Sequence, residues 1–230
     1  MGLAEIVEPS EIEADGDVVE ARVLRAGIWL AVAAVAVQTV LHLANLVLFG
    51  SRFTILDVES DVSLWAWAST AAEAAAAATA ALLAILPRRI AWRLVLLAAL
   101  LAFLSADDIL TIHERISVEQ LGPIPHASRL VWVLVFAPIL GLTGLLLVLE
   151  SRRVPASIGR VMVAGLVMLV VAVAMEATTP VLFALGFDHG SVPYELEAVV
   201  EEGLELAGFI AIWTGLAATV VHRLRTAAST

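Results

Sequence analysis

The sequence predicts an all-α membrane protein, a polytopic bundle of about six transmembrane helices. Hydrophobic residues make up 61% of the 230 positions and charged residues only 16%, and the mean hydropathy is +0.97. Soluble domains are about 45–50% apolar and about 25% charged, so this composition indicates a chain that lies in lipid. Several long apolar runs, separated by short polar segments, predict several membrane crossings.

The first 22 residues predict a disordered acidic tail in the cytoplasm. Seven of the first twenty residues are carboxylic acids and none is basic, a composition that buries too little apolar surface to fold. The membrane domain then covers residues 23–225, and residues 226–230 form a short C-terminal tail. No soluble domain fits in the short segments between the predicted spans.

Six apolar runs are long enough to be transmembrane helices, since a helix needs about 20 residues to cross the hydrocarbon core. They cover residues 27–49, 62–86, 90–112, 129–149, 158–184 and 199–221. Turn-forming residues follow three of them: Gly50 and Ser51, then Pro87, then Gly186. The second run is rich in alanine, which predicts close packing against neighbouring helices.

Arginine supplies every Lys or Arg residue in the chain, and its distribution predicts the orientation. Ten arginines precede the first span or follow the second, fourth and sixth spans: Arg22, Arg25, Arg88, Arg89, Arg93, Arg152, Arg153, Arg160, Arg223 and Arg225. Only Arg52, Arg115 and Arg129 fall on the opposite side. The positive-inside rule therefore predicts a multi-pass protein of the cell (inner) membrane with both termini in the cytoplasm.

Carboxylates inside the spans are the main functional clue. Counting about 20 residues back from the end of the sixth span reaches only Glu202, so Glu202 and Glu205 lie within it. The same count forward from the start of the third span places Asp107 and Asp108 in the outer leaflet. Glu73 lies near the middle of the second span. Acids at such depths face a protein interior or a water-filled cavity rather than lipid.

Helical spacing predicts that several of these acids form one site. Glu197, Glu201 and Glu205 recur every four residues and share a helix face. Carboxylates this close in a low dielectric are neutralised by protons or by a bound cation. We predict a metal site near the extracytoplasmic face, with Asp107, Asp108, His113, Glu114, Glu201, Glu202 and Glu205 as ligands and with His42, Glu73 and Glu176 as a second shell or proton relay.

The predicted cofactor is a divalent metal ion held by oxygen and imidazole ligands, because the chain has no cysteine. Oxygen ligands with one or two imidazoles suit zinc, iron or manganese, whereas an all-oxygen set suits calcium or magnesium. The sequence leaves this choice open. Hydration at helix ends and ion pairs with Arg115 or Arg129 are the structural alternatives for the acids of the third span.

Two acidic motifs resemble a pattern found in uncharacterised bacterial multi-pass membrane proteins. The first is Ser105-Ala-Asp107-Asp108-Ile-Leu-Thr-Ile-His113-Glu114, which fits S-x-D-[DE]-x4-H-E. The second is Glu201-Glu202-Gly-Leu-Glu205-Leu-Ala-Gly208, which fits E-E-x-x-E-x-x-G. The resemblance covers the third and sixth spans and implies that these two segments form one site. It implies no particular chemistry.

Three functions remain open from the sequence. The first is a metal-dependent enzyme that acts on a substrate dissolved in the membrane. The second is a proton- or cation-coupled transporter with Glu73 as its relay. The third is a non-catalytic scaffold whose acids hydrate one face. The lipid bilayer is the expected partner; the chain carries no nucleotide-binding motif, and we expect no nucleic-acid partner.

Overall fold

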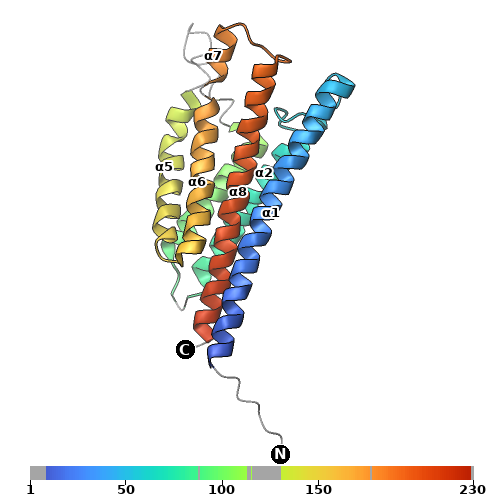
Figure 1. The fold of residues 1–230 in the computed structure, drawn as a ribbon. Helices are drawn as coiled ribbons and strands as arrows, with labels where there is room; N and C mark the ends of the chain where they lie inside the picture. Colours follow the sequence, from blue (N-terminus) through green and yellow to red (C-terminus); the bar gives the residue numbers. More distant parts are fainter. Residues whose placement is uncertain (1–8, 88, 113–114, 116–130, 177, 229–230) are drawn as a thin grey trace, which may run out of the picture.

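The computed structural model describes residues 9–87, 89–112, 115, 131–176 and 178–228. These residues form helices and turns, without a strand in the described ranges. The long helices are α1 (Pro9–Phe49), α2 (Leu64–Ile85), α3 (Trp92–Leu110), α5 (Val131–Ser151), α6 (Ala156–Glu176) and α8 (Val192–Ala228), with a short 3-10 turn η1 (Thr54–Leu56) and a short helix α7 (Thr179–Ala184) (Figure 1). The predicted all-α helical bundle is confirmed.

Five helical segments are long and apolar enough to cross a membrane. They are Val18–Phe49, Leu64–Ile85, Trp132–Ser151, Ala156–Ala184 and Val192–Ala228. Helix α3 is the remaining long helix; its 19 residues include the charged Arg93, Asp107 and Asp108. It packs against α2 and α5, with Asp107 buried and Asp108 half-buried. The protein is therefore a polytopic membrane protein.

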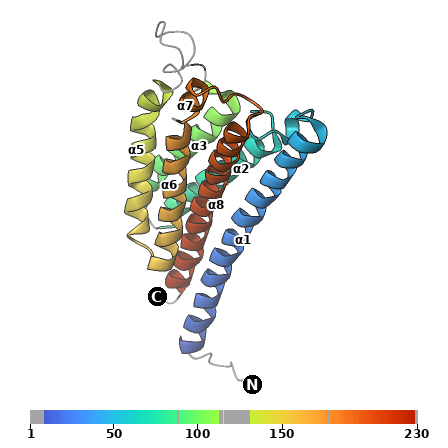
Figure 2. The same ribbon diagram turned by 45° about the horizontal axis from the view of Figure 1, so that its top comes forward.

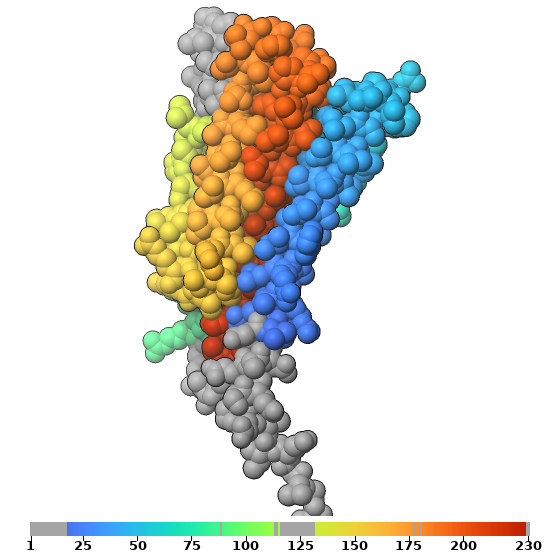
Figure 3. Space-filling view, in the orientation of Figure 1, coloured from blue at the N-terminus to red at the C-terminus, as the bar shows by residue number. Residues whose placement is uncertain are grey.

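Helix α8 is the centre of the bundle. It packs against α1, α2 and α6, whereas α3 packs on α2, and α5 packs on α6 and α3 (Figure 2). In the space-filling view, α8 shows on this face as a strip between α1 and α6 (Figure 3). A helix with neighbours on most sides holds its polar side chains against protein, so α8 is well placed to carry a buried site.

Small residues bring the helices together, as the sequence predicts for α2. Ala76 and Ala80 of α2 have no exposed surface. A Cβ atom at Gly165 of α6 would lie only 2.6 Å from the carbonyl oxygen of Gly208 of α8, so only glycine fits there. Close backbone approach gives the van der Waals contact that holds helices together in lipid, where no hydrophobic force drives them together.

Helix α1 extends further toward the N-terminus than the sequence predicts. Helix α1 includes residues 9–22, while residues 1–8 lie outside the described residues. Near this end, Glu20 accepts hydrogen bonds from His222 Nδ1 at 3.0 Å and from an Arg225 guanidinium nitrogen at 2.7 Å. These contacts with α8 stabilise the turn of α1 around Glu20, which an acidic sequence alone does not favour.

The fifth predicted span is interrupted, because α6 ends at Glu176 and α7 begins at Thr179. Pro180 lies at the start of α7, where its missing N–H and fixed φ angle suit the first turn of a helix but not its interior. Conversely, α8 begins at Val192, seven residues before the predicted start of the sixth span. The turns added to α8 contain Glu195 and Glu197, which are both buried.

The end of the bundle that holds both termini is tied together by ion pairs (Figure 1). Glu150 of α5 is 1% exposed and accepts from Arg93 Nε of α3 at 3.1 Å. Arg223 of α8 also pairs with Glu150, and it donates to the Leu83 carbonyl oxygen of α2 at 3.4 Å. We call Arg93, Glu150 and Arg223 the inner ion-pair cluster. It links four helices at this end.

Candidate functional site

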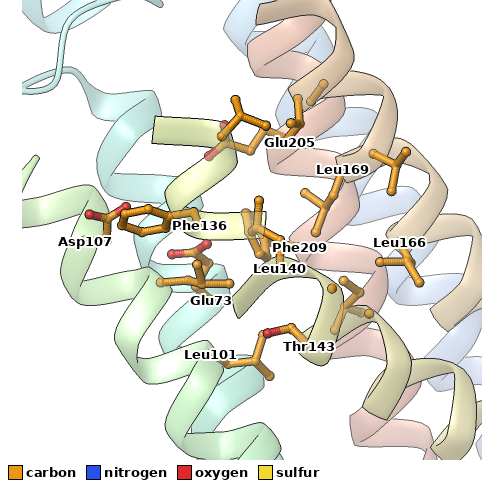
Figure 4. A pocket seen from close by; sticks show the side chains of 18 of the residues that line it. Glu73, Leu101, Asp107, Phe136, Leu140, Thr143, Leu166, Leu169, Glu205 and Phe209 are labelled. Atoms are coloured by element: carbon orange, nitrogen blue, oxygen red, sulfur yellow. The ribbon is translucent and has the colours of Figure 1, made fainter. Parts of the chain in front are cut away.

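A cavity of about 490 Å³ lies between α2, α3, α5, α6 and α8 (Figure 4). Six carboxylates from four of these helices line it: Glu73 of α2, Asp107 and Asp108 of α3, Glu176 of α6, and Glu201 and Glu205 of α8. No basic side chain is among its described lining residues. We call this space the carboxylate cavity. It brings together six of the ten residues that the sequence predicts for the site.

The two glutamates of α8 reach the cavity because of helical spacing. Glu201 and Glu205 are four residues apart and therefore lie one above the other on one helix face. Both are half-buried. Glu202 also belongs to α8 and is half-buried, but it is not among the residues that line the cavity. Of the predicted stripe of Glu197, Glu201 and Glu205, only Glu201 and Glu205 line the cavity.

Glu73 is the most enclosed of the six acids. Its side chain is 1% exposed, and its Oε2 atom has no hydrogen-bond partner among the described residues. Figure 4 shows its carboxylate close to Phe136 and Asp107, on the side of the cavity formed by α2 and α3. Burying a carboxylate oxygen without a partner is costly. A proton or a cation at this oxygen therefore relieves an otherwise unfavourable arrangement.

Apolar side chains form most of the remaining wall. Phe136 and Leu140 of α5, Leu166 and Leu169 of α6, and Phe209 of α8 all line the cavity. None of these apolar residues is predicted from the sequence to belong to the site. Their three- and four-residue spacing is the pattern of any buried helix face, so a sequence offers no signal that separates a cavity wall from a packed core.

His42, predicted as part of the second shell, instead belongs to a separate group of side chains. The backbone N–H of Val58 donates to His42 Nδ1 at 3.3 Å, so the ring proton is on Nε2, which donates to Glu195 Oε2 at 3.0 Å. The backbone N–H of Gly190 donates to the other oxygen of Glu195 at 2.8 Å. This network fastens α1 and the segment after it to the start of α8.

A second pair of contacts joins the same segments. Tyr194 donates a hydrogen bond to Glu59, and His189 Nδ1 lies 3.5 Å from Glu59 Oε2. We call His42, Asp57, Glu59, His189, Tyr194 and Glu195 the outer cluster. Burial raises the pKa of Glu59, although the bond from Tyr194 and the charge of His189 lower it in part.

Glu197 also has structural partners. Thr178 and Thr179 each donate a hydroxyl to its Oε1 at 2.9 Å, across the break between α6 and α7. Glu197 therefore fastens this break to α8 and is not among the residues that line the carboxylate cavity. No sequence pattern indicated the pairing, because it depends on where α6 ends.

The described part of the chain does not form a compact metal centre. Among the described residues, no three His, Asp or Glu side chains lie close enough together to hold a metal ion. His113 and Glu114, two of the predicted ligands, lie outside the described residues. In the described ranges, the acids are spread around the cavity wall on four helices, an arrangement that provides negative charge without a ready ligand set.

A family model described as a domain of unknown function, DUF8692, matches residues 26–220. The matched range contains both acidic motifs and every described residue that lines the carboxylate cavity. It agrees with the predicted resemblance to an uncharacterised family. No curated protein and no solved structure matches the chain.

Proposed function

We propose that this protein, which belongs to the DUF8692 family, binds a cation in the carboxylate cavity of its membrane bundle. The observation that carries the proposal is that six carboxylates line one cavity, with no basic residue among its described lining residues. Acids grouped in a low dielectric require protons or a cation to offset their mutual repulsion. A bound cation satisfies several of them at once.

The charges at the two ends of the bundle favour entry of the cation from the end opposite the inner ion-pair cluster. Arg93 and Arg223 are already paired with Glu150 at the end that holds both termini, and positive charge there repels an approaching cation. The cavity acids lie on the outer halves of α3, α6 and α8. If the arginine distribution sets the orientation, these halves face the extracytoplasmic side.

Thermal unfolding of the purified protein tests the binding of several kinds of cation. The protein is heated in mild detergent with Zn²⁺, Mn²⁺, Ca²⁺, Na⁺ or tetraphenylphosphonium, each added separately. A ligand that binds only the folded state stabilises it, by about 2.7 kcal/mol at a hundred times its Kd. We expect at least one of these cations to raise the unfolding midpoint.

The variants locate the effect. The double substitution Glu201→Gln with Glu205→Gln removes two cavity charges and is expected to abolish the stabilisation. Glu197→Gln is the matched control, since it lies on the same helix outside the cavity and keeps an oxygen that accepts from Thr178 and Thr179. The proposal fails if no cation stabilises the protein, or if the double variant responds as the unaltered protein does.

If the bound cation is a divalent metal, the proposal favours an enzymatic function. His113 and Glu114 would then complete the ligand set with the acids of α3 and α8, and the metal would activate water against a membrane-dissolved substrate. Metal analysis of the protein, purified without chelator, tests this form. Near-stoichiometric zinc, iron or manganese that the double variant lacks would support it, and metal-free protein would count against it.

Cation-coupled transport is a second candidate, and Glu73 favours it. This acid lies near the middle of α2, is almost completely buried, and has an oxygen without a partner among the described residues. Intramembrane acids of this kind are typical of proton relays. In liposomes we expect a proton flux that Glu73→Gln abolishes and Glu197→Gln leaves in place. Absence of flux under any imposed gradient would exclude this candidate.

A further inference from the structure

We infer that the ligand of the carboxylate cavity is an organic cation with an apolar body, which enters from the lipid along α5. This inference rests on the proposed function and names the class of cation. The volume of about 490 Å³ falls within the range of about 300–1,000 Å³ typical of small-molecule pockets. Such a space far exceeds what one directly coordinated metal ion fills.

The cavity has an acidic end and an apolar end. Asp107 of α3 and Glu176 of α6 lie nearer the C-terminal ends of their helices than the apolar lining residues Leu101 and Leu166 do. On α8, which runs in the opposite direction, Glu201 and Glu205 come before Phe209 and Ile212. An inorganic ion matches only the first of these ends. A cation attached to a hydrocarbon body matches both, because its charge meets the acids and its body meets the leucines.

Aromatic rings extend this match. Phe136 is 3% exposed and Phe209 is 6% exposed, and both line the cavity together with Trp132. The rings of Phe136 and Trp132 meet edge to face, with centroids 6.0 Å apart. Aromatic faces attract cations most strongly where water is excluded, and organic ammonium groups are the usual ligands of such surroundings. The rings therefore favour an organic cation over a hydrated metal ion.

Glu73 supplies the independent sign that a ligand belongs here. Its side chain is 1% exposed, it lines the cavity, and its Oε2 atom has no partner among the described residues. Six acids alone show only negative charge. The Oε2 atom of this lining residue has no hydrogen-bond partner among the described residues and therefore marks a position where an incoming positive group gains a direct contact.

The route of entry follows from α5. Ala137, Gly141 and Leu145 recur every four residues, line the cavity and are exposed. A Cβ atom at Gly141 would have no neighbouring atom within 4 Å. Leu134, on the same helix, is 76% exposed, so α5 is a lipid-facing helix. The mouth of the cavity therefore lies along an edge of α5, within reach of molecules dissolved in the bilayer.

Binding of tetraphenylphosphonium and of tetraphenylborate tests the inference, because the two ions have nearly the same size and shape and carry opposite charges. Radiolabelled ions are dialysed against the protein in detergent, and binding to empty micelles is subtracted. We expect saturable binding of one tetraphenylphosphonium per protein and no saturable binding of tetraphenylborate.

Two variants test separately whether binding depends on the charge of the cavity and on its volume. Glu201→Gln with Glu205→Gln is expected to weaken tetraphenylphosphonium binding by about tenfold or more, whereas Glu197→Gln leaves it unchanged. Gly141→Leu keeps every carboxylate and takes volume from the cavity, so it is expected to weaken binding by about tenfold as well. Size-exclusion profiles check that each variant is folded.

The outcomes distinguish this inference from the proposed function. If metal ions stabilise the protein but tetraphenylphosphonium neither binds saturably nor stabilises it, the organic cation is excluded and the cation site stands. If tetraphenylborate binds as tightly as tetraphenylphosphonium, or if both variants bind as the unaltered protein does, the inference is overturned. If no cation acts at all, the proposed function fails with it.

Discussion

The carboxyl group of Glu59 is expected to make the stability of the protein depend on pH. It lies in the segment between α1 and α2, outside the membrane spans, and accepts a hydrogen bond from Tyr194 of α8. Burial raises the pKa of Glu59 above its ordinary value of 4.5. Between pH 4.5 and this raised value, the folded protein therefore holds a proton that the unfolded chain has lost.

Stability is expected to decrease as pH rises through this window and to level off above it, because the folded state binds more protons there. Glu59→Gln should remove this part of the pH dependence, since an amide does not titrate. Unfolding in detergent, followed from about pH 4 to about pH 8, measures the effect. Asp188→Asn, at an exposed acid in the turn after α7, is the control that keeps the dependence. An unchanged slope in Glu59→Gln would contradict the assignment.

At the scale of residues, the sequence predicts the acids of the site better than their partners. Glu201 and Glu205 line one cavity because a helix repeats every 3.6 residues, and this rule needs no tertiary information. His42 belongs to the first long helix as predicted, but the direction it faces depends on how α1 is rotated against α8. Its pairing with Glu195 could be found only once both helices were placed.

At the scale of elements, the contact between α6 and α8 depends on glycine. Gly165→Ala places a methyl group 2.6 Å from the Gly208 carbonyl oxygen, a backbone atom that cannot move alone. Overpacking of this kind costs about 1–3 kcal/mol. We expect Gly165→Ala to lower the free energy of unfolding in detergent by that amount.

Gly141→Ala is the matched control for this prediction. Gly141 is also a helical glycine, but its added methyl group meets no atom within 4 Å. Alanine is favoured over glycine inside a helix by about 1 kcal/mol, so this variant should be as stable as the unaltered protein or slightly more stable. Equal losses in both variants would show that the α6–α8 contact is not unusually close.

Element boundaries were harder to predict than element identity. Apolar length places the six long helices, because crossing a bilayer imposes a minimum on each. The same criterion says nothing about turns that continue into polar sequence, so the start of α8 at Val192 and of α1 at Pro9 were missed. Both extensions are held by side chains of another helix, as Glu20 shows with His222.

At the scale of the whole molecule, the ends of the bundle differ in charge. Arg93, Arg223 and Glu150 gather at the end with both termini, and acids dominate the opposite half. Composition and apolar runs predict this helical bundle. The positions of the arginines and of the acids along the sequence predict that its two ends differ in charge. The ion pairs of Glu150 were not predicted, since an acid near the end of an apolar run has no partner visible in sequence.

The orientation of the bundle is open to a direct labelling experiment, because the chain contains no cysteine. Ala228→Cys places a thiol at the last residue of α8, and Asp188→Cys places one in the exposed turn after α7. The positive-inside rule predicts that a membrane-impermeant maleimide, added outside intact cells, labels Asp188→Cys alone. Labelling of Ala228→Cys alone would show that the protein has the opposite orientation.

The end of α6 at Glu176 also shapes the electric field of the cavity. The carboxyl end of a helix carries about half a negative charge, which arises from aligned peptide dipoles rather than from side chains. Glu176 is both the last residue of α6 and part of the cavity wall, so this dipole charge lies beside the cavity. Protonation of every acid would leave it in place, and the cavity would still disfavour anions at low pH.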